Sequence, residues 1–371
     1  MKEYKLKEGS SIILDFIRGV SAQVVVIGHG ISFFGIFTFL HEPNFPWMQN
    51  IAVLIFFLLS GFLISYSTIR KTSSNNYSFS YYFADRFSRI YTAFVPAIIF
   101  VLIIDLISQG INSEIYKYNN AFNLKTFIGN VFMFQDYPVF QILSYKLTSF
   151  GSARPFWTLA IEWWIYLSFG YLLLVISKKN KITLPNLIVF GFFSIVPVYS
   201  LIMGRGNGLT TYWIFGLIVY IISTLNVLVN VNKNVKVLFL LVFSGLGLFR
   251  AYFKMEAYDP IFAFLLAISL WIIIDLYKDK KFSNTAIKII RYNASISYTL
   301  YLIHYSILSF IKTYFGNSAN PYLLFTIGFI AANVISILIG RYTEIGLTKK
   351  VKQTLYLRIE NKRLLTLNKR H

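Results

Sequence analysis

Long apolar segments recur along almost the whole chain and alternate with shorter polar segments. A membrane-spanning helix needs about 20 predominantly apolar residues, and ten segments come close to this length. We predict helical spans at residues 11–35, 49–69, 86–107, 155–177, 184–203, 209–230, 235–250, 260–277, 293–314 and 321–342. No internal repeat and no second soluble domain interrupts the pattern, which therefore predicts an all-α, polytopic membrane helix bundle.

The distribution of Lys and Arg predicts the orientation of this bundle. If the N-terminus is placed in the cytoplasm, 27 of the 35 basic residues fall on the cytoplasmic side and eight on the other. Cytoplasmic loops carry an excess of Lys and Arg, and an even number of spans returns the chain to its starting side. We therefore expect both termini in the cytoplasm.

The spans divide the chain into a transmembrane domain, residues 1–343, and a basic cytoplasmic tail, residues 344–371. The one long outer loop covers residues 108–153. Within that loop, apolar residues at helical spacing predict a short helix lying on the membrane surface; they are Leu124, Phe127, Ile128, Val131 and Phe132.

The composition supports a membrane protein and excludes several other classes. The chain is 56% hydrophobic and 13% charged, whereas a soluble domain is about 25% charged. It has no Cys, which excludes disulfides, Cys-ligated metals and a thiol nucleophile. The net charge of +20 is better explained by loops that face anionic membrane lipid than by nucleic acid, which we do not expect as a partner.

Ionisable side chains inside the spans are the strongest pointers to function, because each costs about 2.5–3.5 kcal/mol to insert. In the first span, Arg18 and His29 are 11 residues apart, so they point to the same side and lie about 16.5 Å apart along the helix. Asp15 is one turn before Arg18 and can pair with it. We expect Gly28 and Gly30 to leave space for a substrate beside the His29 ring. The alternative is a structural His29 that is hydrogen-bonded to a neighbouring helix.

Other spans carry four further candidates. Arg86 and Arg89 are spaced to share one helix face, where guanidinium groups can hold phosphate; anchoring at the membrane surface is the alternative. Glu162 is predicted at about the depth of His29, where its carboxylate can orient the imidazole. The alternative is that Glu162 is a structural hydrogen-bond partner of another buried polar group. His304 is predicted in mid-membrane, either packed or in contact with substrate.

Five stretches resemble motifs of the acyltransferase-3 family of bacterial membrane acyltransferases. They occur in the family's order and extend over nearly the whole bundle: residues 14–19 running to Gly28-His29, then 56–64, 86–90, 156–163 and 296–304. The resemblance implies transfer of an acyl group, usually acetyl, from cytoplasmic acyl-CoA to a hydroxyl of a sugar or polysaccharide outside the membrane. It also implies the bacterial inner membrane as the location.

By the same resemblance, His29 is the catalytic residue, Arg18 its motif partner, and Arg86 and Arg89 the arginines of the donor site. Acetyl-CoA is then the donor substrate, and no metal is expected. We hypothesise that His29 takes the hydroxyl proton as the acceptor attacks the thioester, while Glu162 orients His29 or stabilises its charged form. A covalent acyl-His29 intermediate stays open. The candidates for further substrate contacts are Asp15, Ser60, Tyr301 and His304.

The same sequence features are compatible with two other functions. In a secondary transporter or a flippase for a polysaccharide precursor, the polar residues would line a translocation path. Transporters often show two related halves, and no such symmetry is found in this chain. An accessory scaffold of a polysaccharide-assembly complex would show no turnover. Transfer or hydrolysis of labelled acetyl-CoA by the purified protein distinguishes these three hypotheses.

Overall fold

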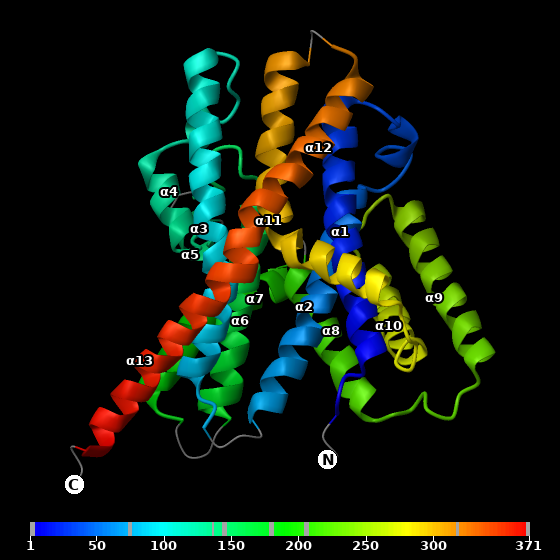
Figure 1. The fold of residues 1–371 in the computed structure, drawn as a ribbon, viewed down its shortest axis with the longest axis vertical. Helices are drawn as coiled ribbons and strands as arrows, with labels where there is room; N and C mark the ends of the chain where they lie inside the picture. The colour runs from blue at the N-terminus through cyan, green and yellow to red at the C-terminus, as the bar shows by residue number, and fades with distance from the viewer. Residues whose placement is uncertain are drawn as a thin grey trace.

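The structure, a computed structural model, is a bundle of α-helices (Figure 1). It describes residues 4–72, 76–135, 137–142, 147–177, 182–203, 208–316 and 319–368. The helices that correspond to the predicted spans are α1 (Glu8–Phe34), α2 (Met48–Thr72), α3 (Phe79–Ile111), α6 (Phe156–Tyr171), α7 (Leu184–Met203), α8 (Leu209–Thr224), α9 (Lys233–Lys254), α10 (Pro260–Leu276), α11 (Asn284–Phe315) and α12 (Pro321–Gly340).

Eight helices in the described part of the chain are long and apolar enough to cross a membrane, and α8 and α10 are shorter apolar helices. The predicted class, an all-α multi-pass membrane protein, is confirmed. The boundaries that differ most from the prediction are the starts of α3 and α11 and the end of α8, each of which comes earlier than predicted. The predicted end of the last span at residue 342 is not a helix end.

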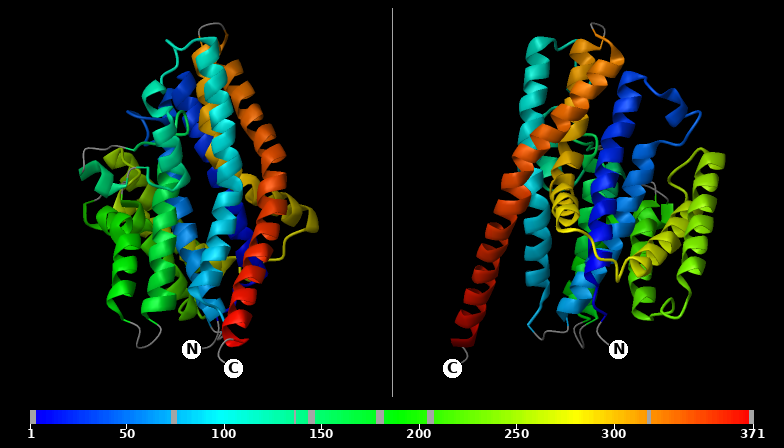
Figure 2. Two further views of the ribbon diagram at one scale, coloured as in Figure 1. Left: turned by 90° about the vertical axis from the view of Figure 1, so that its left-hand side faces the viewer. Right: turned by 45° about the vertical axis from the view of Figure 1, so that its right-hand side comes forward.

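The last span continues into the predicted tail without a break. After α12 the chain passes through a π-helical segment, η5 (Arg341–Leu347), and enters α13 (Thr348–Asn368). The predicted domain boundary between residues 343 and 344 therefore falls inside a continuous helix. Figure 2 shows α13 extending along α3, away from the rest of the bundle. Residues 369–371 of the tail lie outside the described part.

The first turn of α1 and the last turns of α13 lie at the same end of the bundle (Figure 1). This arrangement agrees with an even number of spans, while the side of the membrane that this end faces stays a prediction. In the predicted outer loop, the short helices α4 (Leu124–Val131) and α5 (Pro138–Ile142) follow α3. Helix α4 coincides with the predicted amphipathic segment, and residues 143–146 of the loop are not described.

The helices α2 and α8 approach each other closely where two glycines face the opposite backbone. A Cβ at Gly61 would lie 1.9 Å from the carbonyl oxygen of Trp213, and a Cβ at Gly216 would lie 2.0 Å from that of Leu58. Small residues at such positions let membrane helices pack closely. The contact holds Ser60 against α8, where Nε1 of Trp213 donates a hydrogen bond of 3.2 Å to its Oγ.

The helix α1 packs between α2 and α11, and α11 also packs against α12 and α3. Figure 1 shows that α11 bends sharply part-way along its length. The segment before the bend runs across the bundle, and the segment after it runs beside α1. This arrangement brings polar residues of α11 against α1 on one side and against η5 on the other.

Candidate active site

Two histidines meet where α1 packs against α11. Nδ1 of His29 lies 3.0 Å from Nε2 of His304, and Nδ1 of His304 lies 3.0 Å from the carbonyl oxygen of Leu300. The side chain of His304 is completely buried, whereas part of the His29 surface remains accessible. The structural alternative for His29, a hydrogen bond to a neighbouring helix, is thus present, and it involves a second imidazole.

These contacts determine where neutral rings carry their hydrogens. The Leu300 carbonyl can only accept, so Nδ1 of a neutral His304 donates to it, and Nε2 is left as an acceptor. Nδ1 of His29 must then be the donor in the contact between the rings. Nε2 of His29 is left with a lone pair, which is the form of the ring that a general base requires.

Aromatic rings and packed side chains surround the histidine pair. The Tyr305 ring lies edge-on to His29, with centroids 5.1 Å apart. A Cβ at Gly28 would lie 2.4 Å from Oε1 of Gln49, and a Cβ at Gly30 would lie 2.5 Å from Cε2 of Phe325. The expectation that the two glycines open space for a substrate is therefore wrong, because neighbouring side chains fill the space that they leave.

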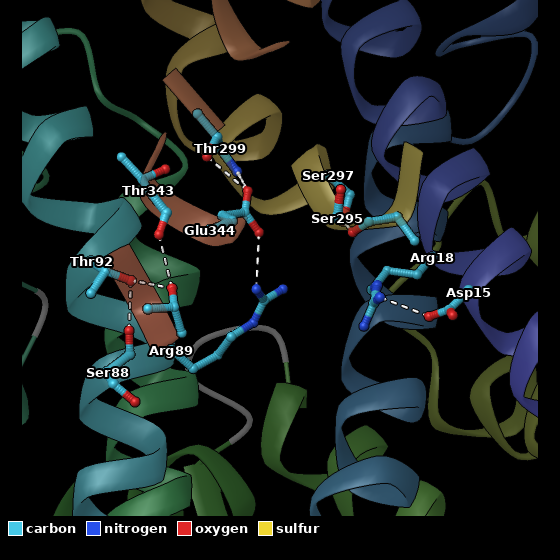
Figure 3. Close-up of polar contacts among 12 residues, drawn as sticks. Asp15, Arg18, Ser88, Arg89, Thr92, Ser295, Ser297, Thr299, Thr343 and Glu344 are labelled. Carbon is cyan, nitrogen blue, oxygen red and sulfur yellow. Dashed lines mark hydrogen bonds and ion pairs between the residues drawn. The ribbon is translucent and has the colours of Figure 1, made fainter. Parts of the chain in front are cut away.

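The predicted pair at the start of α1 is confirmed: Nη2 of Arg18 donates to Oδ1 of Asp15 at 2.7 Å. Nε of Arg18 is buried and has no hydrogen-bond partner among the described residues. Figure 3 shows the guanidinium groups of Arg18 and Arg89 at a similar level, one extending from α1 and the other from α3. The structure thus brings arginines from two motifs into one region of the bundle interior.

Glu344 in η5 connects Arg89 to α11. Its Oε1 accepts hydrogen bonds from the backbone N–H and the hydroxyl of Thr299, at 2.8 and 2.7 Å, and Oε2 lies 3.1 Å from Nη1 of Arg89 (Figure 3). π-helical segments are frequent at functional sites. No role for Glu344 was predicted from the sequence. The signal that was available is its charge, since a carboxylate at the end of an apolar span requires a cationic partner.

Arg86 lies one turn before Arg89 but has different neighbours. Its guanidinium is over the Tyr82 ring, 5.5 Å from the centroid. Its Nε is buried and has no hydrogen-bond partner within the described chain. The preceding residue, Asp85, is buried and pairs with Lys352 of α13 at 2.8 Å. Asp85 was not predicted from the sequence as a site residue, although an acidic residue close to two arginines at the end of a span is itself a signal.

Glu162 belongs to a second polar cluster, which is separate from the histidine pair. The Tyr166 hydroxyl donates to Oε1 of Glu162 through a short hydrogen bond, and Tyr166 also contacts Ser60 at 2.8 Å. Both Glu162 and His29 are among the described residues, and no hydrogen bond joins them. The partner of His29 is therefore His304 rather than Glu162.

Tyr301 lies between the two clusters. Its hydroxyl is 2.6 Å from Oγ1 of Thr158, one turn before Glu162 on α6, and its ring centroid is 6.0 Å from that of His304. The polar residues of the site thus extend from Glu162, through Thr158 and Tyr301, to the imidazoles.

The fold and this site define a multi-pass membrane protein that holds three partly buried arginines and a histidine pair in one helix bundle. A family model described as "Acyltransferase domain" matches residues 12–341. The chain belongs to this family, which is the acyltransferase-3 family that its motifs resemble. Membership of this family supports an enzyme that transfers an acyl group, with an acyl donor and an acceptor as its substrates.

The chain is similar over part of its length to several curated proteins, among them the following two. An O-acetyl transferase of Shigella phage Sf6 is 31% identical over 186 residues, which are 49% of this chain and 51% of that protein. "Protein 2 in picA locus" of Rhizobium radiobacter is 33% identical over 87 residues, 24% of this chain and 41% of that protein. The chain thus spans about half the length of the curated relatives it matches. No solved structure matches it.

Proposed function

We propose that this protein transfers an acyl group, acetyl in the simplest case, from cytoplasmic acyl-CoA to a hydroxyl of an extracytoplasmic sugar or polysaccharide. Membership of the acyltransferase family supports the reaction class. The similarity to a phage protein named as an O-acetyl transferase supports acetyl as the group and oxygen as the acceptor atom. The excess of Lys and Arg at the end of the bundle that carries both termini supports a bacterial inner membrane with this end in the cytoplasm.

The observation that carries the proposal is the pair of hydrogen bonds that connects the Leu300 carbonyl to His304 and His304 to His29, which we call the relay. It leaves Nε2 of His29 unprotonated. This nitrogen takes the proton of the acceptor hydroxyl as the hydroxyl oxygen attacks the thioester carbonyl. The carbon–sulfur bond then breaks, and the CoA sulfur leaves with the proton from Nε2. His304 is a positioning residue in this proposal, because both of its ring nitrogens are occupied and neither is available to the substrate.

The arginines are suited to the phosphates of the donor. Nε of Arg18 and Nε of Arg86 are buried without hydrogen-bond partners in the described chain, and phosphate oxygens would satisfy such donors through charge-assisted bonds. Arg18 and His29 are 11 residues apart on one helix, a rise of about 16.5 Å. The pantetheine arm of CoA is comparable in length, so a donor held at the arginines can present its thioester at His29.

The cluster of Glu162, Tyr166 and Ser60 lies along this path. Its carboxylate is within the electrostatic range of the arginines, and its hydroxyl groups can hydrogen-bond the amides of the arm. We assign Glu162 to this path rather than to the orientation of His29. Tyr301, whose ring centroid is 6.0 Å from that of His304, connects this cluster to the imidazoles and is the candidate for contact with the reacting carbonyl.

The experiment compares bacterial cells that carry the wild-type protein, His29→Ala, or the control His41→Ala in the loop after α1. Ester-linked acetyl groups on surface polysaccharide are quantified by mass spectrometry, and membrane abundance is measured by immunoblot. We expect acetylation with wild type and with the control, and none with His29→Ala at equal abundance. Equal acetylation with His29→Ala would overturn the proposal.

A further inference from the structure

A pocket of about 550 Å³ lies where α13 meets the start of α3. This volume is within the range of small-molecule sites, about 300–1,000 Å³. The pocket is at the end of the bundle that carries both termini, at the foot of the helix that holds Arg86 and Arg89. Its lining includes Tyr77 and Tyr81 from the α3 side and Tyr356, Glu360 and Arg363 from α13.

The buried Asp85 carboxylate holds α13 against α3 and so fixes the walls of the pocket. Its Oδ1 accepts a hydrogen bond of 2.9 Å from the Tyr356 hydroxyl and pairs with Lys352 at 2.8 Å. Its Oδ2 accepts from the Tyr77 hydroxyl at 2.9 Å and pairs with Lys71. Because breaking a buried ion pair is costly, the Asp85 carboxylate stabilises the contact between the two helices that form the walls of the pocket.

The pocket has an aromatic corner and is lined on one side by a helix of net positive charge. The rings of Tyr81 and Tyr356 meet edge to face, with centroids 4.9 Å apart. Helix α13 carries six basic residues and one acidic residue. Arg363 contacts the amide oxygen of Asn76 at 3.3 Å and forms no ion pair within the described chain. Aromatic rings beside an Arg that forms no ion pair suit a planar base that carries phosphates.

On the basis of the proposed function, we infer that this pocket binds the nucleotide end of the CoA thioester, with the adenine base at Tyr81 and Tyr356 and the 3′-phosphate at Arg363. Arg86 is five residues after Tyr81 on α3, a rise of about 7.5 Å, and its guanidinium lies over the Tyr82 ring; we assign it to the diphosphate. Tyr81 and Arg89 are eight residues apart on α3, a rise of about 12 Å. That separation suits a nucleotide placed between the aromatic corner and the arginines. In this arrangement α13 forms part of the donor site.

The test uses the full-length protein in detergent and three variants. Arg363→Ala and Tyr81→Leu alter the pocket, and Arg358→Ala is the matched control, because Arg358 is exposed on the same helix and does not line the pocket. Binding of 3′,5′-adenosine diphosphate is measured by calorimetry. The KM values for acetyl-CoA and for acetyl-pantetheine, which lacks the nucleotide, are measured in parallel.

We expect Arg363→Ala to weaken nucleotide binding about tenfold and to raise the acetyl-CoA KM by the same factor, because the substitution removes one charge-assisted hydrogen bond. The acetyl-pantetheine KM and the Arg358→Ala control should not change. If the wild type turns over acetyl-CoA but both pocket variants keep its KM and its nucleotide affinity, the pocket assignment is wrong and the transfer reaction stands. Arg363-dependent nucleotide binding without any acetyl transfer would support the pocket and refute the proposed function.

Discussion

His304→Leu is expected to lower kcat without unfolding the bundle. Leucine keeps apolar bulk at this fully buried position but removes the nitrogen that accepts from Nδ1 of His29 at 3.0 Å. His29 then either keeps an unsatisfied N–H or moves its hydrogen to Nε2, where it blocks the base. An unsatisfied buried polar group costs about 1–3 kcal/mol, which corresponds to roughly a 5- to 150-fold loss in rate.

The assay follows release of the CoA thiol and separates kcat from the KM for acetyl-CoA. The KM should stay within about twofold, since the substitution leaves the arginines untouched. His304→Gln should restore part of kcat, because its amide can both accept from His29 and donate to the Leu300 carbonyl. His41→Leu in the loop is the control. Wild-type kcat in His304→Leu, or a His304→Gln variant that is no faster than His304→Leu, would refute the relay.

Three other substitutions test the donor site and the packing. Arg89→Ala should raise the acetyl-CoA KM about tenfold and the acceptor KM less; an unchanged donor KM would remove Arg89 from the donor site. Glu344→Ala should lower the melting temperature more than Glu344→Gln, whose amide oxygen can still accept from α11; equal losses would contradict this account. Gly61→Ala places a Cβ 1.9 Å from a backbone oxygen and should cost roughly 1–3 kcal/mol of stability, whereas Gly245→Ala, which faces open space, should not.

Features that depend on local sequence were predictable. Each of the predicted spans coincides with a helix because the apolar length of a segment is a property of that segment alone. The contact between Asp15 and Arg18 was predictable for the same reason, since residues three apart on a helix are neighbours.

Contacts between distant helices were not predictable from periodicity. Whether His29 meets Glu162 or His304 depends on the tilt and rotation of α1, α6 and α11, and on the bend in α11, which no Pro marks in the sequence. The start of α3 and the end of α12 were misplaced because polar residues usually end an apolar span. Asp85 and Glu344 remain inside helices, since Lys352 and Arg89 from other helices neutralise them.

Transfer of acetyl across the membrane through His29 is tested in sealed vesicles in which protease accessibility shows that the α13 end of the protein faces outward. Labelled acetyl-CoA is added outside, and the polysaccharide identified by mass spectrometry is enclosed inside. We expect the wild-type protein to transfer the labelled acetyl group to the enclosed polysaccharide as an ester, and we expect no transfer by His29→Ala. Transfer by His29→Ala at the wild-type rate, or transfer only when both substrates are on the same side, would contradict this proposal.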